Sequence, residues 1–207
     1  MPSRNTIREF LPDCHYHVFN RGVEKRDIFL DEQDYTVFLG ILKKYLTGET
    51  IKTHRHPFKN FAQELHLLSY CLMPNHYHLL FYQKTEQSIT EFMRRVTTGY
   101  VMYFNNRYNR VGGLFQGRYR ASLIHKDEYL HHISRYIHLN SKDYQTWPHS
   151  SLAYYQGRKT AKWVNTAQIL SLFDNSRDKY LEFVADYDLN KRELDTLKWQ
   201  LANGREL

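Results

Sequence analysis

The sequence predicts an α+β fold, a ferredoxin-like βαββαβ unit whose four-stranded antiparallel sheet is covered by two helices. Four short segments rich in aliphatic, aromatic and β-branched residues are typical of strands. Two long segments with helical apolar spacing separate the first strand from the second and the third from the fourth. This order is that of the split βαβ unit. An additional helix is expected after the last strand.

The first half of the unit is expected to contain strands at 15–20, 64–72 and 77–83 and a helix at 32–47. Asp31 is a suitable N-cap for this helix. Pro74-Asn75 predicts a turn between the second and third strands.

The second half is expected to contain a helix at 88–109, a strand at 119–124 and a helix at 127–140. Ser88-Ile89-Thr90-Glu91 has the spacing of a capping box, which predicts the start of the long helix. Gly112-Gly113 then breaks the chain before the fourth strand.

The character of the chain changes after Trp147-Pro148, and short helices are expected at 165–174, 177–187 and 190–203. We therefore expect a principal domain at 1–149 and a small helical C-terminal appendage at 150–207.

Composition narrows the classes of function. The 207 residues carry a formal net charge of +7, which favours nucleic acid as a partner. No run of 18 apolar residues occurs, so no membrane span is expected. The N-terminal segment has no apolar signal core, and we expect a cytoplasmic location.

His76 and His78 lie two residues apart on the third expected strand, so their side chains share one face and Tyr77 points to the other. Two such imidazoles can bind one divalent metal ion. A His-x-His pair is also compatible with structural or exposed histidines. His15-Tyr16-His17 repeats the pattern, and we expect one of the two pairs to be structural.

Tyr136 and Asn140 are four residues apart on the expected last helix and therefore share a face. An amide oxygen can bind a metal ion, and a phenol can act as a nucleophile beside it. An exposed tyrosine and a helix-ending asparagine give the same spacing without any chemistry.

Residues 88–126 contain seven basic residues and one acid, Glu91, with aromatic residues interleaved. Basic side chains contact phosphates, and exposed aromatics can stack on unpaired bases. Many of these aromatics also fit a helix core. We expect the arginines to bind DNA, namely Arg94, Arg95, Arg107, Arg110, Arg118 and Arg120.

Taken together, these motifs resemble the single-tyrosine HUH transposases (IS200-like transposases), and within them the REP-associated tyrosine transposases. The resemblance covers roughly residues 12–155. Its matching stretches are Tyr16-His17-Val18-Phe19-Asn20-Arg21-Gly22, Met73-Pro74-Asn75-His76-Tyr77-His78, Phe115-Gln116-Gly117-Arg118-Tyr119 and Tyr136-Ile137-His138-Leu139-Asn140.

The resemblance implies a metal-dependent transposase that cleaves and rejoins single-stranded DNA beside hairpins. It implies that His76, His78 and Asn140 bind Mg²⁺ or Mn²⁺ and that Tyr136 forms a covalent 5′-phosphotyrosine intermediate. A nearby cation, such as Arg135 or the metal, is expected to favour the phenolate. The resemblance also implies association with the bacterial nucleoid and is compatible with a monomer or a homodimer.

Two other functions remain open from the residues. A domesticated nucleic-acid-binding protein would bind DNA or RNA without catalysis. A metal-dependent hydrolase would need a carboxylate or a further histidine beside the metal, and His15, His17 or His66 can supply one.

Overall fold

The computed structural model describes residues 10–47, 59–124 and 127–186. Its strands are β1 (Cys14–Arg21), β2 (Leu65–Met73), β3 (His76–Gln83) and β4 (Arg120–Ile124). Its longer helices are α1 (Glu32–Leu46), α2 (Ser88–Arg107), α3 (Asp127–His138) and α6 (Arg177–Ala185). Shorter helical turns are η1 (Val23–Lys25), α4 (Leu152–Tyr155), α5 (Ala167–Leu170) and η2 (Ser171–Phe173). The expected helix at 190–203 lies outside the described residues. Across the described ranges, none of the helices combines the length and apolar character that a membrane crossing needs.

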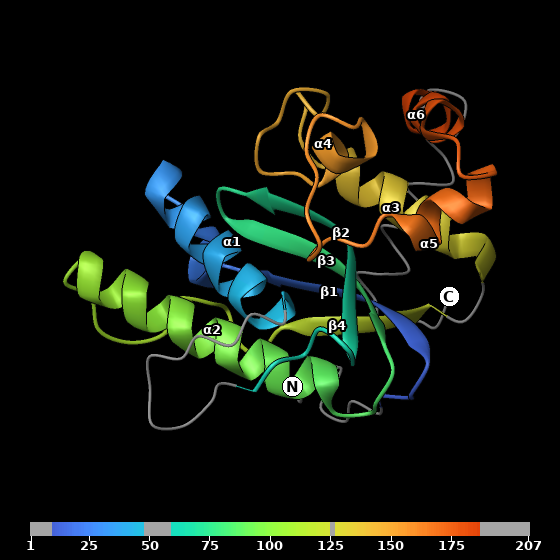
Figure 1. Ribbon diagram of the computed structural model, residues 1–207. Coiled ribbons are helices and arrows are strands. Elements are labelled where there is room, and N and C mark those ends of the chain that lie inside the picture. The colour runs from blue at the N-terminus through green and yellow to red at the C-terminus, as the bar shows by residue number, and fades with distance from the viewer. Residues whose placement is uncertain (1–9, 48–58, 125–126, 187–207) are drawn as a thin grey trace.

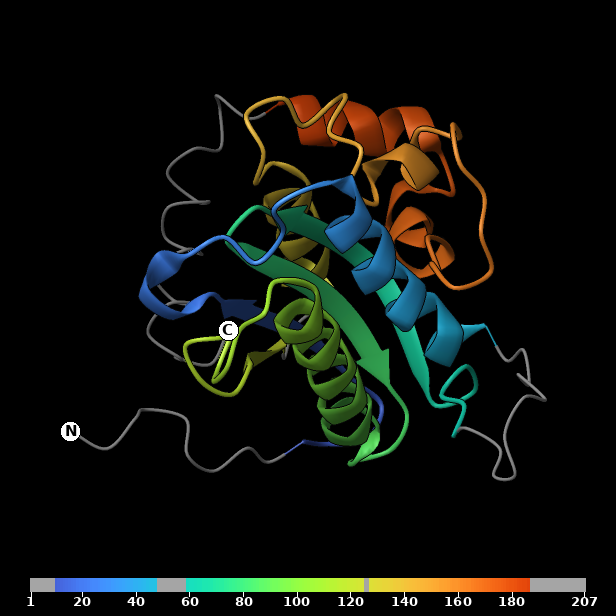
Figure 2. The same cartoon turned by 90° about the vertical axis from the view of Figure 1, so that its left-hand side faces the viewer.

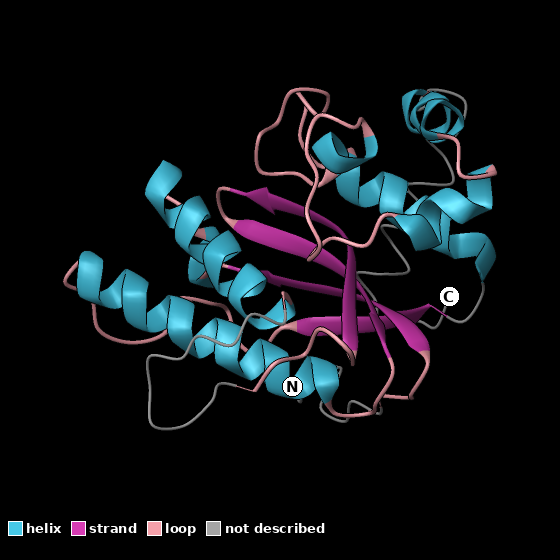
Figure 3. Ribbon diagram, viewed as in Figure 1, coloured by secondary structure: helices cyan, strands magenta, loops and turns pink. Residues whose placement is uncertain are grey.

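The four strands form one antiparallel sheet in the order β2-β3-β1-β4 (Figure 3). With α1 between β1 and β2 and α2 between β3 and β4, this is the ferredoxin-like arrangement, and the predicted fold class is confirmed. Pro74 and Asn75 connect β2 to β3, as expected.

Side chains alternate across the sheet, so each face builds its own core. Helices α1 and α2 lie side by side on one face, and α3 lies on the other with α4, α5 and α6 (Figures 1 and 2). Tyr77 is fully buried on the α1/α2 face, where its ring contacts Phe38 and Phe115. It therefore points away from its neighbours His76 and His78, as the strand period predicts.

The helix starts agree only in part with the sequence signals. Asp31 caps α1, since its side chain accepts hydrogen bonds from the backbone N–H groups of Gln33 and Asp34. The predicted capping box at Ser88 is wrong, because Gln87 is the N-cap and Ser88 is already helical. The buried Ser88 hydroxyl donates instead to the Glu64 carboxylate at 3.2 Å, so it bonds to the segment just before β2 and does not cap the helix.

The second core joins α3 to the C-terminal segment. Ile133 and Ile137 of α3 are buried in the same cluster as Leu80 of β3 and Tyr155 and Tyr180 of the C-terminal segment. The C-terminal helices thus pack directly on the helix that follows the sheet. The division of the chain at residue 149 stays a prediction.

A buried polar network fixes the position of α3. The two ring nitrogens of His138 lie 2.7 Å from the Tyr180 hydroxyl and 2.7 Å from the Ser151 hydroxyl. Ser134 Oγ also lies 2.7 Å from the Tyr180 hydroxyl. Ser151 Oγ accepts from the backbone N–H of Tyr70 on β2 at 2.8 Å. These hydrogen bonds link α3 to α6 and to the sheet.

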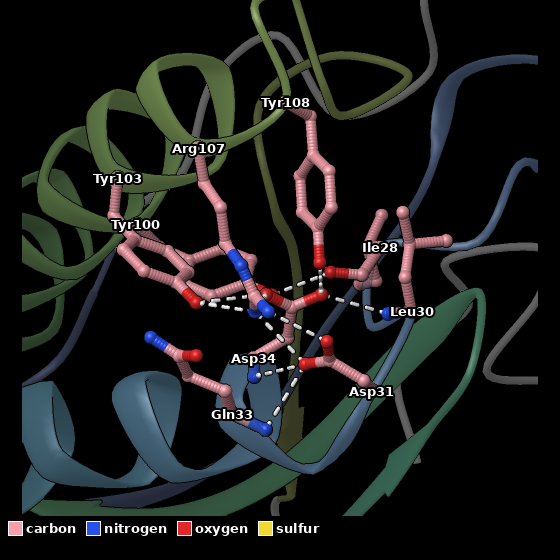
Figure 4. A network of polar contacts seen from close by, with 9 residues as sticks. All are labelled: Ile28, Leu30, Asp31, Gln33, Asp34, Tyr100, Tyr103, Arg107 and Tyr108. Carbon is pink, nitrogen blue, oxygen red and sulfur yellow. Dashed lines mark hydrogen bonds and ion pairs between the residues drawn. The ribbon is translucent and has the colours of Figure 1, made fainter.

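A second polar network joins the start of α1 to the end of α2 (Figure 4). Its centre is the carboxylate of Asp34, which is completely buried. The carboxylate accepts hydrogen bonds at 2.8–2.9 Å from Leu30 N, Tyr103 Oη, Tyr108 Oη and Arg107 Nη1. Arg107 also pairs with the half-exposed Asp31 at 2.6 Å. The charge of Asp34 is therefore offset where it is buried.

We predict that Asp34→Ala lowers the free energy of unfolding by about 3 kcal/mol, because it removes a buried charge from its hydrogen-bonded partners. Asp31→Ala is the matched control, with an expected loss of about 1 kcal/mol from the lost N-cap. Urea unfolding measures both values. Equal losses in the two variants would contradict this role for Asp34.

Burial also makes stability depend on pH through His138, whose pKa it lowers to about 3. Histidine in an unfolded chain titrates near pH 6.5, so below that pH the unfolded state binds a proton that the folded state does not. The stabilisation is present above pH 6.5 and is lost as the pH falls toward 3. We predict a smaller loss between pH 7 and pH 5 for His138→Gln than for the wild type in urea titrations. An unchanged pH slope would refute this assignment.

Candidate active site

The candidate site lies on the face of the sheet that α3 covers. His76 and His78 of β3 point to this face, and their ring centroids are 5.1 Å apart. His78 is buried and His76 is partly exposed. The structure therefore brings the two predicted metal-binding histidines together at the edge of the core under α3.

Helix α3 brings the predicted nucleophile and the third predicted ligand to the same place. The Tyr136 ring stands edge-on to His78, with centroids 5.4 Å apart. Asn140 lies just beyond the helix end, and its Oδ1 is 3.1 Å from His76 Nε2. The Asn140 Nδ2 donates to the Tyr136 carbonyl at 3.5 Å, which orients the amide oxygen toward His76. All four predicted catalytic and metal residues thus converge.

The hydrogen bonds around His76 determine which of its nitrogens carries the proton. Asn75 Nδ2 donates to the Lys25 carbonyl at 3.2 Å, so Asn75 Oδ1 faces His76. This oxygen is 2.6 Å from His76 Nδ1 and can only accept, so Nδ1 carries the proton. In a neutral His76, the lone pair of Nε2 then faces the lone pairs of Asn140 Oδ1. A cation is the group that two such convergent lone pairs fit.

The site favours neutral imidazoles. Burial lowers the pKa of His78 well below its usual value, and neighbouring His17, His76 and Arg21 lower it further. Burial also lowers the pKa of His76, opposed by the contact with Asn140. Because metals bind the unprotonated ring nitrogen, these shifts favour metal binding near neutral pH.

The third predicted ligand is an amide, that of Asn140. Within the described ranges, no group of three or more His, Cys, Asp or Glu side chains is arranged to hold a metal ion. The predicted donor set would be two imidazoles and the Asn140 oxygen, of which the amide oxygen suits Mg²⁺ or Mn²⁺ and the imidazoles suit Mn²⁺ better than Mg²⁺.

One histidine of the His15–His17 pair, His17, lies in the candidate site. His17 Nε2 is 2.8 Å from His78 Nδ1, and both rings are buried. Burial lowers the pKa of His17 to about 3. His15, two residues earlier on the same strand, lies with its ring centroid 5.1 Å from that of Tyr82. Of the His15–His17 pair, only His17 contacts a predicted metal ligand, and it does so from the neighbouring strand.

The predicted DNA-binding arginines divide between the two faces of the molecule. Arg120 lies opposite Phe19 on β1, which in turn lies opposite His78, so Arg120 is on the site face. Arg118 is exposed two residues before it. The other predicted arginines lie on or just after α2, which covers the opposite face: Arg94, Arg95, Arg107 and Arg110.

Two arginines have structural contacts that the sequence did not indicate. Arg107 pairs with Asp31 and Asp34, so its charge is already offset by carboxylates and the structure does not support the predicted role in DNA binding. Arg135 is completely buried, with its guanidinium 4.0 Å from the Phe183 ring centroid. This geometry supports a role in holding α3 against α6 and does not support the expected activation of Tyr136.

Sequence reasoning missed two exposed or partly exposed residues of β1 beside the site. Arg21 lies opposite His76, and Phe19 lies opposite His78, with its ring stacked at 5.8 Å from the His78 ring. Arg21, Phe19 and His17 alternate along the strand and so share a face. This period of two, counted from His17, was the signal that could have identified them.

The chain is similar to known proteins in sequence family and in fold. The family model described as "Transposase IS200 like" matches residues 11–140. No curated protein matches the sequence.

Two solved structures resemble the chain. One is a REP-associated tyrosine transposase bound to a REP hairpin, with a TM-score of 0.57, 13% identity, and coverage of 79% of this chain and 92% of that one. The other is a putative transposase from Deinococcus radiodurans R1, with a TM-score of 0.39, 17% identity, and coverage of 66% and 95%. The first shows that the fold is shared. The match to the family model covers more than half of the sequence, and the chain therefore belongs to the IS200-like transposase family.

Proposed function

We propose that this transposase cleaves and rejoins single-stranded DNA through a covalent bond to Tyr136. The observation that carries the proposal is the convergence of His76 Nε2 and Asn140 Oδ1, 3.1 Å apart, beside the Tyr136 ring. A neutral His76 that donates from Nδ1 to Asn75 cannot also donate to Asn140 Oδ1, and a bound cation would interact favourably with both groups. A tyrosine beside a metal site on a rigid helix is a suitable nucleophile.

In the proposed step, the Tyr136 oxygen forms a bond to the scissile phosphorus and loses its proton. The bond from phosphorus to the 3′ oxygen breaks, and that oxygen takes up a proton as a free 3′-hydroxyl. The product is a 5′-phosphotyrosine. Because this link is itself a phosphodiester, another 3′-hydroxyl can attack it and rejoin strands without an external energy source.

His76, His78 and Asn140 would hold Mg²⁺ or Mn²⁺. When bound, the ion supplies Lewis-acid stabilisation of negative charge on the phosphoryl oxygens. The protein keeps both imidazoles neutral by burial and holds Asn140 through the Tyr136 carbonyl. The hydrogen bond from Asn140 to the Tyr136 carbonyl thereby fixes the proposed third ligand relative to the proposed nucleophile.

We propose hairpin-flanked single-stranded DNA as the substrate, with its strand crossing the site face next to β1 and β4. Arg21 and Arg120 are exposed there and can contact phosphates on either side of the site. Phe19 lies between His78 and Arg120 and is partly exposed, so an unpaired base can stack on it. The related structure described as bound to a REP hairpin supports this substrate class.

The nucleophile is tested with labelled hairpin oligonucleotides drawn from the DNA that flanks the gene. In Mg²⁺ or Mn²⁺, we expect a protein–DNA adduct on a denaturing gel that Tyr136→Phe and EDTA abolish, while Tyr136→Phe still binds DNA. The phenyl ring preserves packing and removes only the attacking oxygen. An adduct formed by Tyr136→Phe would refute the assignment.

The same experiment separates the alternatives. A metal-dependent hydrolase would turn over DNA without an adduct, and a non-catalytic binding protein would give binding alone. Either result from the wild-type protein, across several hairpins and both metals, would contradict the proposed reaction.

The DNA path is tested by the salt dependence of binding. We predict that Arg21→Gln and Arg120→Gln each weaken binding of single-stranded DNA and reduce the slope of log K against log[salt] by about 0.7, the value for one lost phosphate contact. Arg94→Gln, on the opposite face, is the matched control and should leave the slope unchanged. Fluorescence anisotropy over a salt series measures all three. A loss confined to Arg94→Gln would place the DNA on α2 instead.

A further inference from the structure

The contact between His17 and His78 has a consequence for metal binding. The two rings approach through one nitrogen each, His17 Nε2 and His78 Nδ1, at 2.8 Å. Their planes are nearly parallel, 12° apart, with centroids at 5.0 Å. Both side chains are almost fully buried, so water does not replace this hydrogen bond.

One proton must lie between these two nitrogens, and its position decides what His78 can do. A neutral imidazole carries a proton on one nitrogen and a lone pair on the other. If His17 donates, His78 Nδ1 is the acceptor and His78 Nε2 carries a proton, which blocks metal binding there. If His78 donates, its Nε2 is left with the lone pair that a metal requires. Among the described residues, His78 Nε2 has no hydrogen-bond partner to compete for that lone pair.

We infer that His17 is a positioning residue that accepts the Nδ1 proton of His78 and so holds His78 in its metal-binding tautomer. This inference rests on the proposed metal site. It gives His17 the role toward His78 that Asn75 has toward His76, whose Nδ1 lies 2.6 Å from the Asn75 oxygen. Hydrogen bonds of this kind orient metal-binding histidines in other proteins.

The cost of this arrangement is visible at the other nitrogen of His17. Its Nδ1 is buried and has no hydrogen-bond partner. If His17 Nε2 is the acceptor, the proton of the neutral ring lies on Nδ1, which has no acceptor to bond to among the described residues. An apolar residue at this position would avoid the cost of the unpaired group. A bound metal offsets this cost because it stabilises the same tautomer of His78.

The test compares metal affinity in three variants. His17→Leu removes the acceptor, His17→Gln keeps an oxygen acceptor near the position of Nε2, and His15→Leu is the control on the same strand and face. We expect Mn²⁺ titration calorimetry to show a 10- to 100-fold weaker affinity for His17→Leu. His17→Gln should recover most of the affinity, and His15→Leu should bind as the wild type does. This pattern separates loss of the acceptor from general damage to the strand.

The proton itself is observed by nitrogen NMR of ring-labelled histidines in the Mg²⁺-loaded protein. We expect a protonated Nδ1 on His78 and an unprotonated Nε2 on His17. A protonated His17 Nε2, or wild-type affinity in His17→Leu, would overturn the inference while adduct formation by Tyr136 still stood. Absence of Mn²⁺ binding in the wild type would overturn the inference and the proposed function together.

Discussion

The site depends on the position of α3 against the sheet. The pleat places His76 and His78 on one face, but the proposed nucleophile comes from α3 and the proposed third ligand from the turn just after it, about 60 residues later in the chain. Buried hydrogen bonds from His138 to Tyr180 and Ser151 hold that helix. They lie on the side of α3 that faces α4 and α6, so the described part of the C-terminal segment, residues 150–186, supports the site by holding α3 in place.

The two faces of the sheet differ in how completely helices cover them. The α1/α2 face is a large aromatic core closed by the Asp34–Arg107 network, and it stabilises the fold. The α3 face is less completely closed, because β1 and β4 carry the partly exposed Phe19 and the exposed Arg21 and Arg120 beside the histidines. Because the α1/α2 core stabilises the sheet, the α3 face can carry polar and exposed side chains on strands that keep their positions.

Much of this was predictable from the sequence. Strand and helix periods predicted the element order, and the spacing of His76–His78 and Tyr136–Asn140 predicted which side chains share a face. The contact between His17 and His78 was not predictable, because it depends on the register between β1 and β3, which brings together residues 61 positions apart. Charge alone also did not show which arginines lie on the site face, or that Arg107 and Arg135 have structural partners. Local signals can mislead as well, since Ser88 has capping-box spacing but bonds to Glu64.

The central claim is that His76, His78 and Asn140 form one metal site beside Tyr136. A crystal structure of the protein soaked in Mn²⁺, with anomalous diffraction to locate the ion, tests it most directly. We predict one anomalous peak about 2.0–2.3 Å from His76 Nε2, His78 Nε2 and Asn140 Oδ1. A fully occupied Mn²⁺ site elsewhere, with His76 Nε2 still directed at Asn140 and no peak between them, would contradict the claim.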